Sequence, residues 1–215
     1  KNRHLSPSLT GCQSPRAVRR GLRGILEENP GFQVVGEAGD WGELRRVLRE
    51  SAVDVVVLDI GLPGRSGIEI VQSLAEEHPT VKVLMLSIYP EDQYGLRALK
   101  SGAAGYLNKS SAPEELVRAV ETVASGRKYV SGALAQALVD NLTGAADEAP
   151  HERLSNREFQ TLCLIAQGKR LADIAETLAL SPKTVSVYRA RILEKMGLAN
   201  NAELTHYALK NRLVE

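Results

Sequence analysis

The feature that most constrains the fold is an alternation, over residues 32–109, of short apolar runs with longer amphipathic stretches. Four of the apolar runs predict β-strands, at residues 32–38, 53–59, 81–87 and 104–109. The second and third runs are almost entirely apolar and rich in Val, which is typical of strands buried on both faces. Strands that alternate with helices in this way favour right-handed crossovers and a parallel sheet covered by helices on both sides.

The stretches around these strands predict helices. One precedes the first strand and carries its apolar residues on one face. Another, after the last strand, starts with Pro-Glu-Glu, which is a favourable first helical turn. The expected helices are Ala17–Glu28, Trp41–Ser51, Gly67–His78, Glu91–Ser101, Pro113–Ser125 and roughly Gly132–Leu142.

The last third of the chain has a different character. The segment TGAADEAPHE has no periodicity and predicts a linker, and beyond it the sequence contains only short helical stretches. Residues 31–150 carry eleven Lys or Arg against seventeen Asp or Glu, whereas residues 151–215 carry ten against seven. A basic end is suited to binding a polyanion. We therefore expect an α/β domain, a helix with a linker, and an all-helical domain, at residues 1–130, 131–152 and 153–215.

Other patterns disfavour several classes of protein. Cys12 and Cys163 are too few and too far apart for a disulfide framework or a zinc site. No stretch approaches the roughly twenty apolar residues of a membrane helix. The basic, polar N-terminus lacks the apolar core of a secretory signal. We therefore expect a cytoplasmic protein with no membrane partner.

Three of the predicted strands end in polar residues, Asp59, Ser87 and Lys109. In an open α/β sheet, functional groups gather at the carboxyl ends of the strands. A carboxylate beside an apolar strand is costly to bury alone, so a nearby cation is expected, and Lys109 supplies one. The spacing by itself fits either a structural ion pair beside a hydrogen-bonded Ser or a functional site.

The segments VDVVVLDIGLPGRSGIE, VLMLS and GAAGYLNK resemble, in order and spacing, the receiver domain of two-component response regulators of the NarL/FixJ type. The resemblance runs from about Ala17 to Leu142. It implies an α/β fold with a doubly wound, five-stranded parallel sheet of the flavodoxin-like kind. It also implies that this domain accepts a phosphoryl group.

The resemblance assigns a role to each residue of the predicted pocket. Asp59 would take the phosphoryl group from a histidine kinase. Lys109 would neutralise the phosphoryl oxygens, and Ser87 would hydrogen-bond one of them. Tyr106 would be the aromatic residue that turns inward once Ser87 moves.

The resemblance breaks ahead of the first predicted helix. Receivers open with an apolar strand that ends in two adjacent acids, which bind Mg2+ together with the acceptor Asp. Gln13 and Ser14 stand at those positions, and the preceding HLSPSLTGC is not a convincing strand. Asp59 and the backbone carbonyl of Gly61 would remain as metal ligands, and together they supply only one protein charge to a hard dication. We therefore expect weak or absent Mg2+ binding and slow or absent phosphorylation.

The basic end predicts a helix-turn-helix. Ser155 and Glu158 have the spacing of a capping box, and the helix behind them has an apolar face that includes Cys163 as a small core residue. A short helix follows at Leu171–Leu180, with Ile174, Ala175 and Leu178 inward. Another helix starts at Ser181-Pro182 and runs to about Met196, and a further short helix follows at Ala202–Lys210. Charge alone favours the simpler interpretation that Lys183, Arg189, Arg191 and Lys195 merely solvate a surface helix.

The segments LSNRE and IAETLALSPKTVSVYRARILEKMG resemble the LuxR-type DNA-binding domain over its whole length. The resemblance implies that Pro182–Lys195 is a recognition helix that enters a major groove, with Val185 and Ile192 toward the core. The residues facing the bases would be Lys183, Ser186, Val187 and Ala190. The candidates for phosphate contacts are Lys183, Thr184, Tyr188, Arg189 and Arg191. Because the base-facing residues discriminate poorly, a homodimer on paired half-sites is expected.

These features predict a DNA-binding transcription regulator of a two-component system, with double-stranded DNA and a cognate histidine kinase as partners. One alternative is a phosphorylation-independent regulator whose acidic domain is an interaction or dimerisation module. The missing acids are also compatible with a start, over the first fifteen or so residues, that is not the native one, and the otherwise intact pocket slightly favours this explanation. A quorum sensor is disfavoured, because 4% aromatic residues provide little for a small-molecule pocket. No other catalytic constellation occurs, so we do not expect an enzyme.

Overall fold

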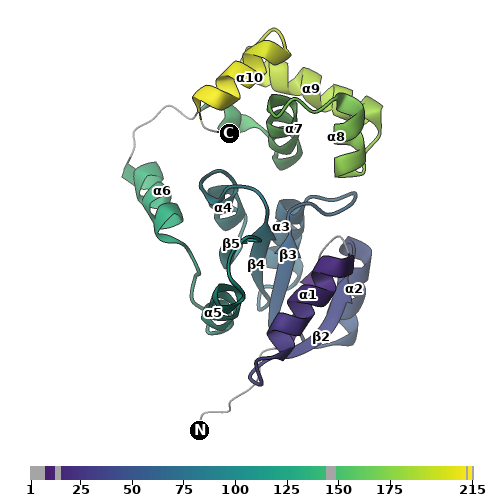
Figure 1. The fold of residues 1–215 in the computed structure, drawn as a ribbon, viewed down its shortest axis with the longest axis vertical. Coiled ribbons are helices and arrows are strands. Elements are labelled where there is room, and N and C mark those ends of the chain that lie inside the picture. Colours follow the sequence, from purple (N-terminus) through teal and green to yellow (C-terminus); the bar gives the residue numbers. More distant parts are fainter. Residues whose placement is uncertain (1–7, 13–15, 144–148, 212, 215) are drawn as a thin grey trace. The chain divides into compact units, whose positions relative to one another are not determined.

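The computed structural model describes residues 8–12, 16–143, 149–211, 213 and 214. The chain divides into two compact units, residues 1–142 and 143–215. Figure 1 shows an α/β architecture in the first unit and helices alone in the second. Within the described residues, no helix combines the length and apolarity needed to span a membrane.

The first unit is built on a five-stranded parallel sheet with the order β2-β1-β3-β4-β5. This arrangement confirms the predicted receiver-type fold. The four strands predicted from apolar runs are present, and β3 is buried along its whole length. The strands are β1 Ser8–Cys12, β2 Gln33–Ala38, β3 Val55–Asp59, β4 Lys82–Ser87 and β5 Gly105–Asn108.

Strand β1 corrects the sequence analysis, because the HLSPSLTGC segment does contain a strand. β1 lies between β2 and β3, where Leu9 pairs with Val34 on one side and with Val55 on the other. Leu9 fills the core, and the buried hydroxyl of Thr10 donates a 2.9 Å hydrogen bond to the carbonyl of Gly36. Backbone bonding along both edges therefore forms this strand despite its weak local strand propensity.

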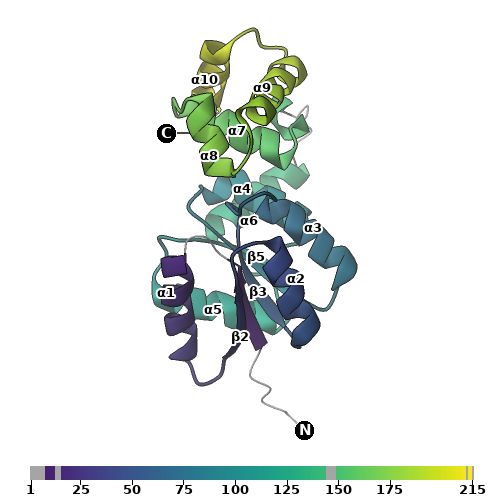
Figure 2. The ribbon, with the colours of Figure 1, turned by 90° about the vertical axis from the view of Figure 1, so that its right-hand side faces the viewer.

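Helices cover both faces of the sheet (Figure 2). Helices α1 (Arg16–Glu27) and α5 (Pro113–Ala124) pack on one face, where they enclose an apolar core with β1, β3, β4 and β5. Helices α2 (Trp41–Glu50), α3 (Gly67–Glu77) and α4 (Glu91–Lys100) lie on the other face. These helices match the predicted ones to within one residue at each end.

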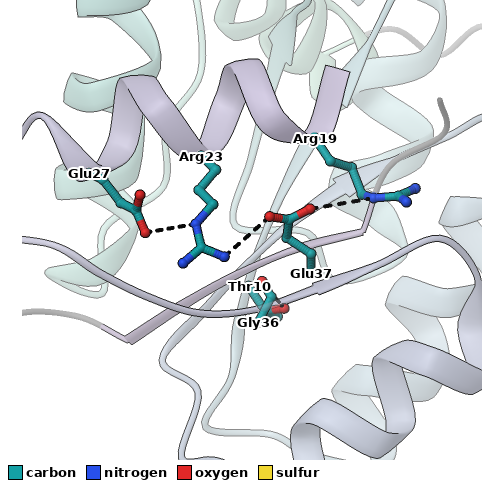
Figure 3. A network of polar contacts seen from close by, with 6 residues as sticks. All are labelled: Thr10, Arg19, Arg23, Glu27, Gly36 and Glu37. Atoms are coloured by element: carbon teal, nitrogen blue, oxygen red, sulfur yellow. Dashed lines mark hydrogen bonds and ion pairs between the residues drawn. The ribbon is translucent and has the colours of Figure 1, made fainter. Parts of the chain in front are cut away.

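A chain of ion pairs links α1 to β2 (Figure 3). Glu37 accepts from Arg23 Nη1 at 3.3 Å, and its other oxygen lies 3.7 Å from Arg19 Nε. Arg23 Nε also donates to Glu27 at 2.8 Å. The hydrogen bond to Glu37, together with the hydrogen bond to Glu27 and the negative charges of both carboxylates, raises the pKa of Arg23 above its ordinary value. These contacts join the arginine-rich helix to β2, although exposed pairs of this kind contribute little stability individually.

The helix predicted near residue 132 is α6 (Gly132–Thr143), and it packs on α4. Leu134 is fully buried there, and a Cβ placed on Gly95 of α4 would lie 2.8 Å from it. The segment before α6 follows the sheet edge, where Tyr129 forms an isolated parallel bridge with Gly105 of β5. Tyr129 donates a 3.0 Å hydrogen bond to Glu115, and burial together with this contact raises its pKa to about 12.

The second unit contains four α-helices after a 3-10 turn in its described part. The turn η1 (Pro150–Arg153) falls where the sequence predicts a linker without structure. It forms because His151 packs near Phe159, with a 6.0 Å distance between ring centroids, and its Nδ1 lies 2.8 Å from the hydroxyl of Tyr207. The helices are α7 Asn156–Ala166, α8 Leu171–Leu178, α9 Pro182–Met196 and α10 Asn201–Lys210.

Candidate functional site

The carboxyl ends of three neighbouring strands bring Asp59, Ser87 and Lys109 together. Asp59 ends β3 and Ser87 ends β4, and the backbone N–H of Lys109 donates a 2.7 Å hydrogen bond to the carbonyl of Ser87. The Nζ of Lys109 forms an ion pair with Oδ2 of Asp59. Asp59 is 5% exposed and Ser87 is fully buried, so these polar groups are largely shielded from solvent.

Two glycines shape the loop after Asp59. The backbone N–H of Gly61 donates to Oδ1 of Asp59 at 3.1 Å, which fixes the carboxylate opposite its contact with Lys109. Gly67, the first residue of α3, approaches the same strand so closely that a Cβ would lie 2.1 Å from the carbonyl oxygen of Asp59. Only Gly allows the helix to begin at this distance, since any side chain would overlap the backbone.

A hydrogen-bonded chain runs from Ser87 to Tyr106. Ser87 Oγ accepts from the backbone N–H of Tyr89 at 3.0 Å, and the carbonyl of Tyr89 accepts from the hydroxyl of Tyr106 at 2.8 Å. Tyr106 is fully buried, so its ring lies inward in this structure. Burial raises the pKa of Tyr106 well above its ordinary value of 10.0. The Tyr89 ring also stacks on Tyr94 of α4, with ring centroids 4.6 Å apart.

The metal-binding residues predicted for this pocket are only partly described. Gln13 and Ser14 lie outside the described residues. Among the described residues, no three His, Cys, Asp or Glu side chains gather as a metal site. Asp59 is already held by Lys109 and by Gly61. Mg2+ in proteins keeps several water ligands and is held by one or two carboxylates, and Asp59 is the carboxylate that the described part of this pocket offers to such an ion.

In the second unit, the predicted helix-turn-helix is formed by α8, a short turn and α9. Ala179 ends α8 with a φ of 52°, in the left-handed region, and turns the chain toward α9. Ser181 caps α9 by accepting from the N–H of Thr184 at 3.0 Å. Val185 and Ile192 are fully buried, as the seven-residue spacing predicts.

The predicted DNA-contacting residues occupy the outer side of α9. Val187 is 42% exposed, so its side chain is accessible on the surface of the helix. Lys183, Ser186, Ala190 and Arg191 are also exposed, whereas Thr184, Tyr188 and Arg189 are half-buried. The residues predicted to face bases therefore form a continuous, accessible face of the helix.

Two features of this unit are missed by the sequence analysis. Lys195 Nζ donates a 2.6 Å hydrogen bond to Glu158 in α7, and Arg189 Nε donates one of the same length to Asn201 in α10. Both contacts join α9 to another helix of this unit. The capping-box spacing indicates only that Glu158 bonds to its own helix end, which it also does by accepting from Ser155 N–H at 2.8 Å.

The chain matches two protein families and several known proteins. Residues 13–121 match the response regulator receiver domain, and residues 152–208 match the bacterial regulatory proteins of the luxR family. The response regulator UvrY of Escherichia coli (strain K12) is 39% identical over 197 residues, which cover 91% of this chain and 90% of UvrY. The response regulator GacA of Pseudomonas protegens is 37% identical over 198 residues, which cover 92% of this chain and 93% of GacA.

A solved structure supports the same architecture. RcsB from Salmonella enterica serovar Typhimurium superposes with a TM-score of 0.65 over 94% of this chain and 98% of RcsB, at 24% sequence identity. This likeness concerns the fold. Taken with the two family matches and the full-length relatives, it shows that the chain belongs to the response regulators that join a receiver domain to a luxR-family helix-turn-helix domain.

Proposed function

We propose that this protein is a DNA-binding transcription regulator of a two-component system, in which a histidine kinase phosphorylates Asp59 and thereby controls dimerisation and DNA binding. The observation that carries the proposal is the placement of Asp59 against Lys109 and beside Ser87 at the carboxyl edge of the sheet. The relatives of similar length, UvrY and GacA, are themselves named response regulators.

The pocket suits a phosphoryl transfer that depends on charge placement. A carboxylate oxygen of Asp59 attacks the phosphorus of a phosphohistidine on the kinase, so an O–P bond forms while the N–P bond breaks and the electron pair leaves on the imidazole. Lys109, which already contacts the carboxylate, neutralises charge on the phosphoryl oxygens. Ser87 donates its hydroxyl hydrogen to one of these oxygens. Because the N–H of Tyr89 is hydrogen-bonded to Ser87 Oγ, a movement of Ser87 also moves the loop that begins at Tyr89.

We propose that Mg2+ binds this pocket only weakly. When bound, the ion supplies positive charge close to the phosphoryl oxygens. Its proposed protein ligands are Asp59 and the carbonyl of Gly61, with Gln13 and Ser14 in place of the usual acids. A single carboxylate charge, shared with Lys109, attracts a hard dication less than the acid-rich set of other receivers.

Labelling with a small-molecule phosphodonor tests both proposals. Wild type and Asp59→Asn are incubated with phosphoramidate over a series of Mg2+ concentrations, and intact mass reports the phosphorylated fraction. We expect slow labelling of wild type that needs millimolar Mg2+ and no labelling of Asp59→Asn. Rapid stoichiometric labelling at micromolar Mg2+ would contradict the weak metal site, and labelling of the Asn variant would exclude Asp59 as the acceptor.

The second candidate function is a phosphorylation-independent regulator. It is favoured by one observation, which is that Gln13 and Ser14 replace the acid pair. In this case the first unit serves as an interaction or dimerisation module and the DNA-binding unit is unchanged. Complete absence of labelling at saturating Mg2+, with DNA binding retained, would select this alternative.

For the second unit, we propose that α9 enters the major groove as a recognition helix. Lys183, Ser186, Val187 and Ala190 face the bases, and Arg189 and Arg191, with Thr184 and Tyr188, contact phosphates. An exposed Val and Ala can contact thymine methyl groups but donate no hydrogen bonds, so one subunit discriminates weakly. Paired half-sites bound by a homodimer supply the remaining selectivity.

A further inference from the structure

We propose that Asn201, which lies outside the recognition helix, is a positioning residue for DNA binding that holds the Arg189 guanidinium ready for a phosphate contact. The inference rests on the proposed DNA-binding function and extends it to α10. Asn201 is the first residue of α10 and lies twelve positions after Arg189. Nothing in its sequence context points to this role, because an exposed Asn near a helix start is usually a cap.

The contact uses one particular atom of the arginine. Nε of Arg189 donates a 2.6 Å hydrogen bond to Oδ1 of Asn201. The two terminal amino groups of the guanidinium form no further bond with the described residues. These two groups lie in one plane and can donate to two oxygens of a phosphate. The Asn therefore restrains the side chain without occupying the part that would bind DNA.

The support beneath Asn201 is rigid. The preceding Asn200 caps α10 by accepting from the N–H of Glu203 at 3.0 Å, and Glu203 in turn accepts from the N–H of Ala199 at 2.8 Å. Gly197, with a φ of 66°, ends α9 and directs the chain into this turn. Asn201 itself is therefore not needed as the cap, and its amide is free to hold Arg189.

The position of Arg189 on α9 makes the restraint useful. It lies one turn after Ser186, beside the proposed base-facing side of the helix. A free arginine side chain loses rotamer freedom when it binds a phosphate, whereas a side chain that is already fixed loses less. Removing the restraint should weaken DNA binding by about three- to tenfold, which corresponds to immobilising one long side chain.

A double-mutant cycle on the full chain tests the proposal. Wild type, Asn201→Ala, Arg189→Ala and the double variant are titrated by fluorescence anisotropy against a random-sequence duplex of about three helical turns. The random duplex isolates phosphate contacts, and Asn211→Ala, an exposed Asn at the other end of α10, is the matched control. NMR of the Arg189 Nε–H resonance provides an independent signature that a general loss of stability would not produce.

We expect Asn201→Ala to weaken binding about three- to tenfold in wild type but less than twofold in the Arg189→Ala background. The Arg189 Nε–H resonance should exchange faster with water in Asn201→Ala only. Equal losses in both backgrounds, or an unchanged resonance, would overturn the positioning role while leaving the DNA-binding function intact. If wild type shows no salt-dependent binding to duplex DNA, either untreated or after incubation with phosphoramidate and Mg2+, the proposed function fails and this inference fails with it.

Discussion

The ammonium group of Lys195, near the end of α9, donates a 2.6 Å hydrogen bond to the carboxylate of Glu158, in the first turn of α7. The Glu158 side chain is 3% exposed, and the same oxygen, Oε2, also accepts from the N–H of Ser155. The contact therefore joins the proposed recognition helix to the start of the helix beneath it. Lys195 thus helps to hold α9 against α7, rather than simply solvating the surface of α9.

We predict that Glu158→Gln removes a pH-dependent part of the stability of the second unit. Burial by itself raises the pKa of Glu158. The hydrogen bonds from Lys195 and Ser155 lower this pKa by more than burial raises it, so the net pKa lies below the ordinary value of 4.5. A carboxyl whose pKa is lowered on folding stabilises the protein above its unfolded pKa, and this stability is lost as the pH falls through the folded pKa. The wild type should therefore lose stability below about pH 4.5, and the variant should lose less.

At neutral pH, Glu158→Gln should lower the free energy of unfolding by about 1 to 2 kcal/mol, because it removes a charge-assisted hydrogen bond. Urea unfolding followed by far-UV circular dichroism between pH 3 and pH 7 measures both effects. Glu194→Gln, an exposed change on α9, is the control. Parallel pH profiles for wild type and Glu158→Gln would contradict the prediction.

Gly67→Ala should destabilise the first unit strongly, by about 3 kcal/mol or more, because overpacking displaces backbone. Its Cβ would meet the carbonyl oxygen of Asp59 at 2.1 Å, so α3 would have to move away from the pocket. Urea unfolding monitored by the fluorescence of Trp41, the single tryptophan, reports on this unit.

Gly24→Ala is the matched control for Gly67→Ala. Gly24 lies in the interior of α1, and a Cβ there would have no neighbour within 4 Å. This substitution should stabilise the protein by about 0.5 to 1 kcal/mol, through helix propensity alone. If both substitutions shift the urea midpoint in the same direction, the steric argument at Gly67 is wrong.

Ala179→Gly should stabilise the second unit by about 0.5 to 1 kcal/mol. Ala179 has a φ of 52° and is the sole non-glycine with positive φ among the described residues. A Cβ in the left-handed region costs about 1 to 2 kcal/mol, and Gly avoids this cost but gains freedom in the unfolded chain. Thermal unfolding by circular dichroism should show a higher midpoint, whereas Ala172→Gly, an exposed change within α8, should lower it.

Leu134→Ala should release α6 from α4. Leu134 is fully buried against the space left by Gly95, and truncation of a buried Leu costs about 2 to 5 kcal/mol. We expect faster limited proteolysis within residues 132–143 and faster amide exchange there. Ala133→Ser, at an exposed neighbouring position, should leave both rates unchanged. Unchanged protection in Leu134→Ala would show that α6 is held by other contacts.

Much of the fold follows from local sequence pattern. The apolar runs of β3 and β4 and the amphipathic periods of the helices predict an α/β unit followed by a helical one. Strand β1 is the exception, since Ser8–Cys12 contains a single large apolar residue. It becomes a strand because β2 and β3 hydrogen-bond to its two edges, and such pairing between distant segments has no signature in a short window of sequence.

By itself, the sequence determined which residues stand at the pocket and on the proposed recognition helix. Asp59, Ser87 and Lys109 each follow an apolar strand, and strand ends converge in a parallel sheet. The tertiary structure alone decided the contacts between helices: Lys195 with Glu158, Arg189 with Asn201, and Leu134 over Gly95. These partners lie 12 or more positions apart along the chain. Their side chains therefore meet only because the helices pack together in the folded protein.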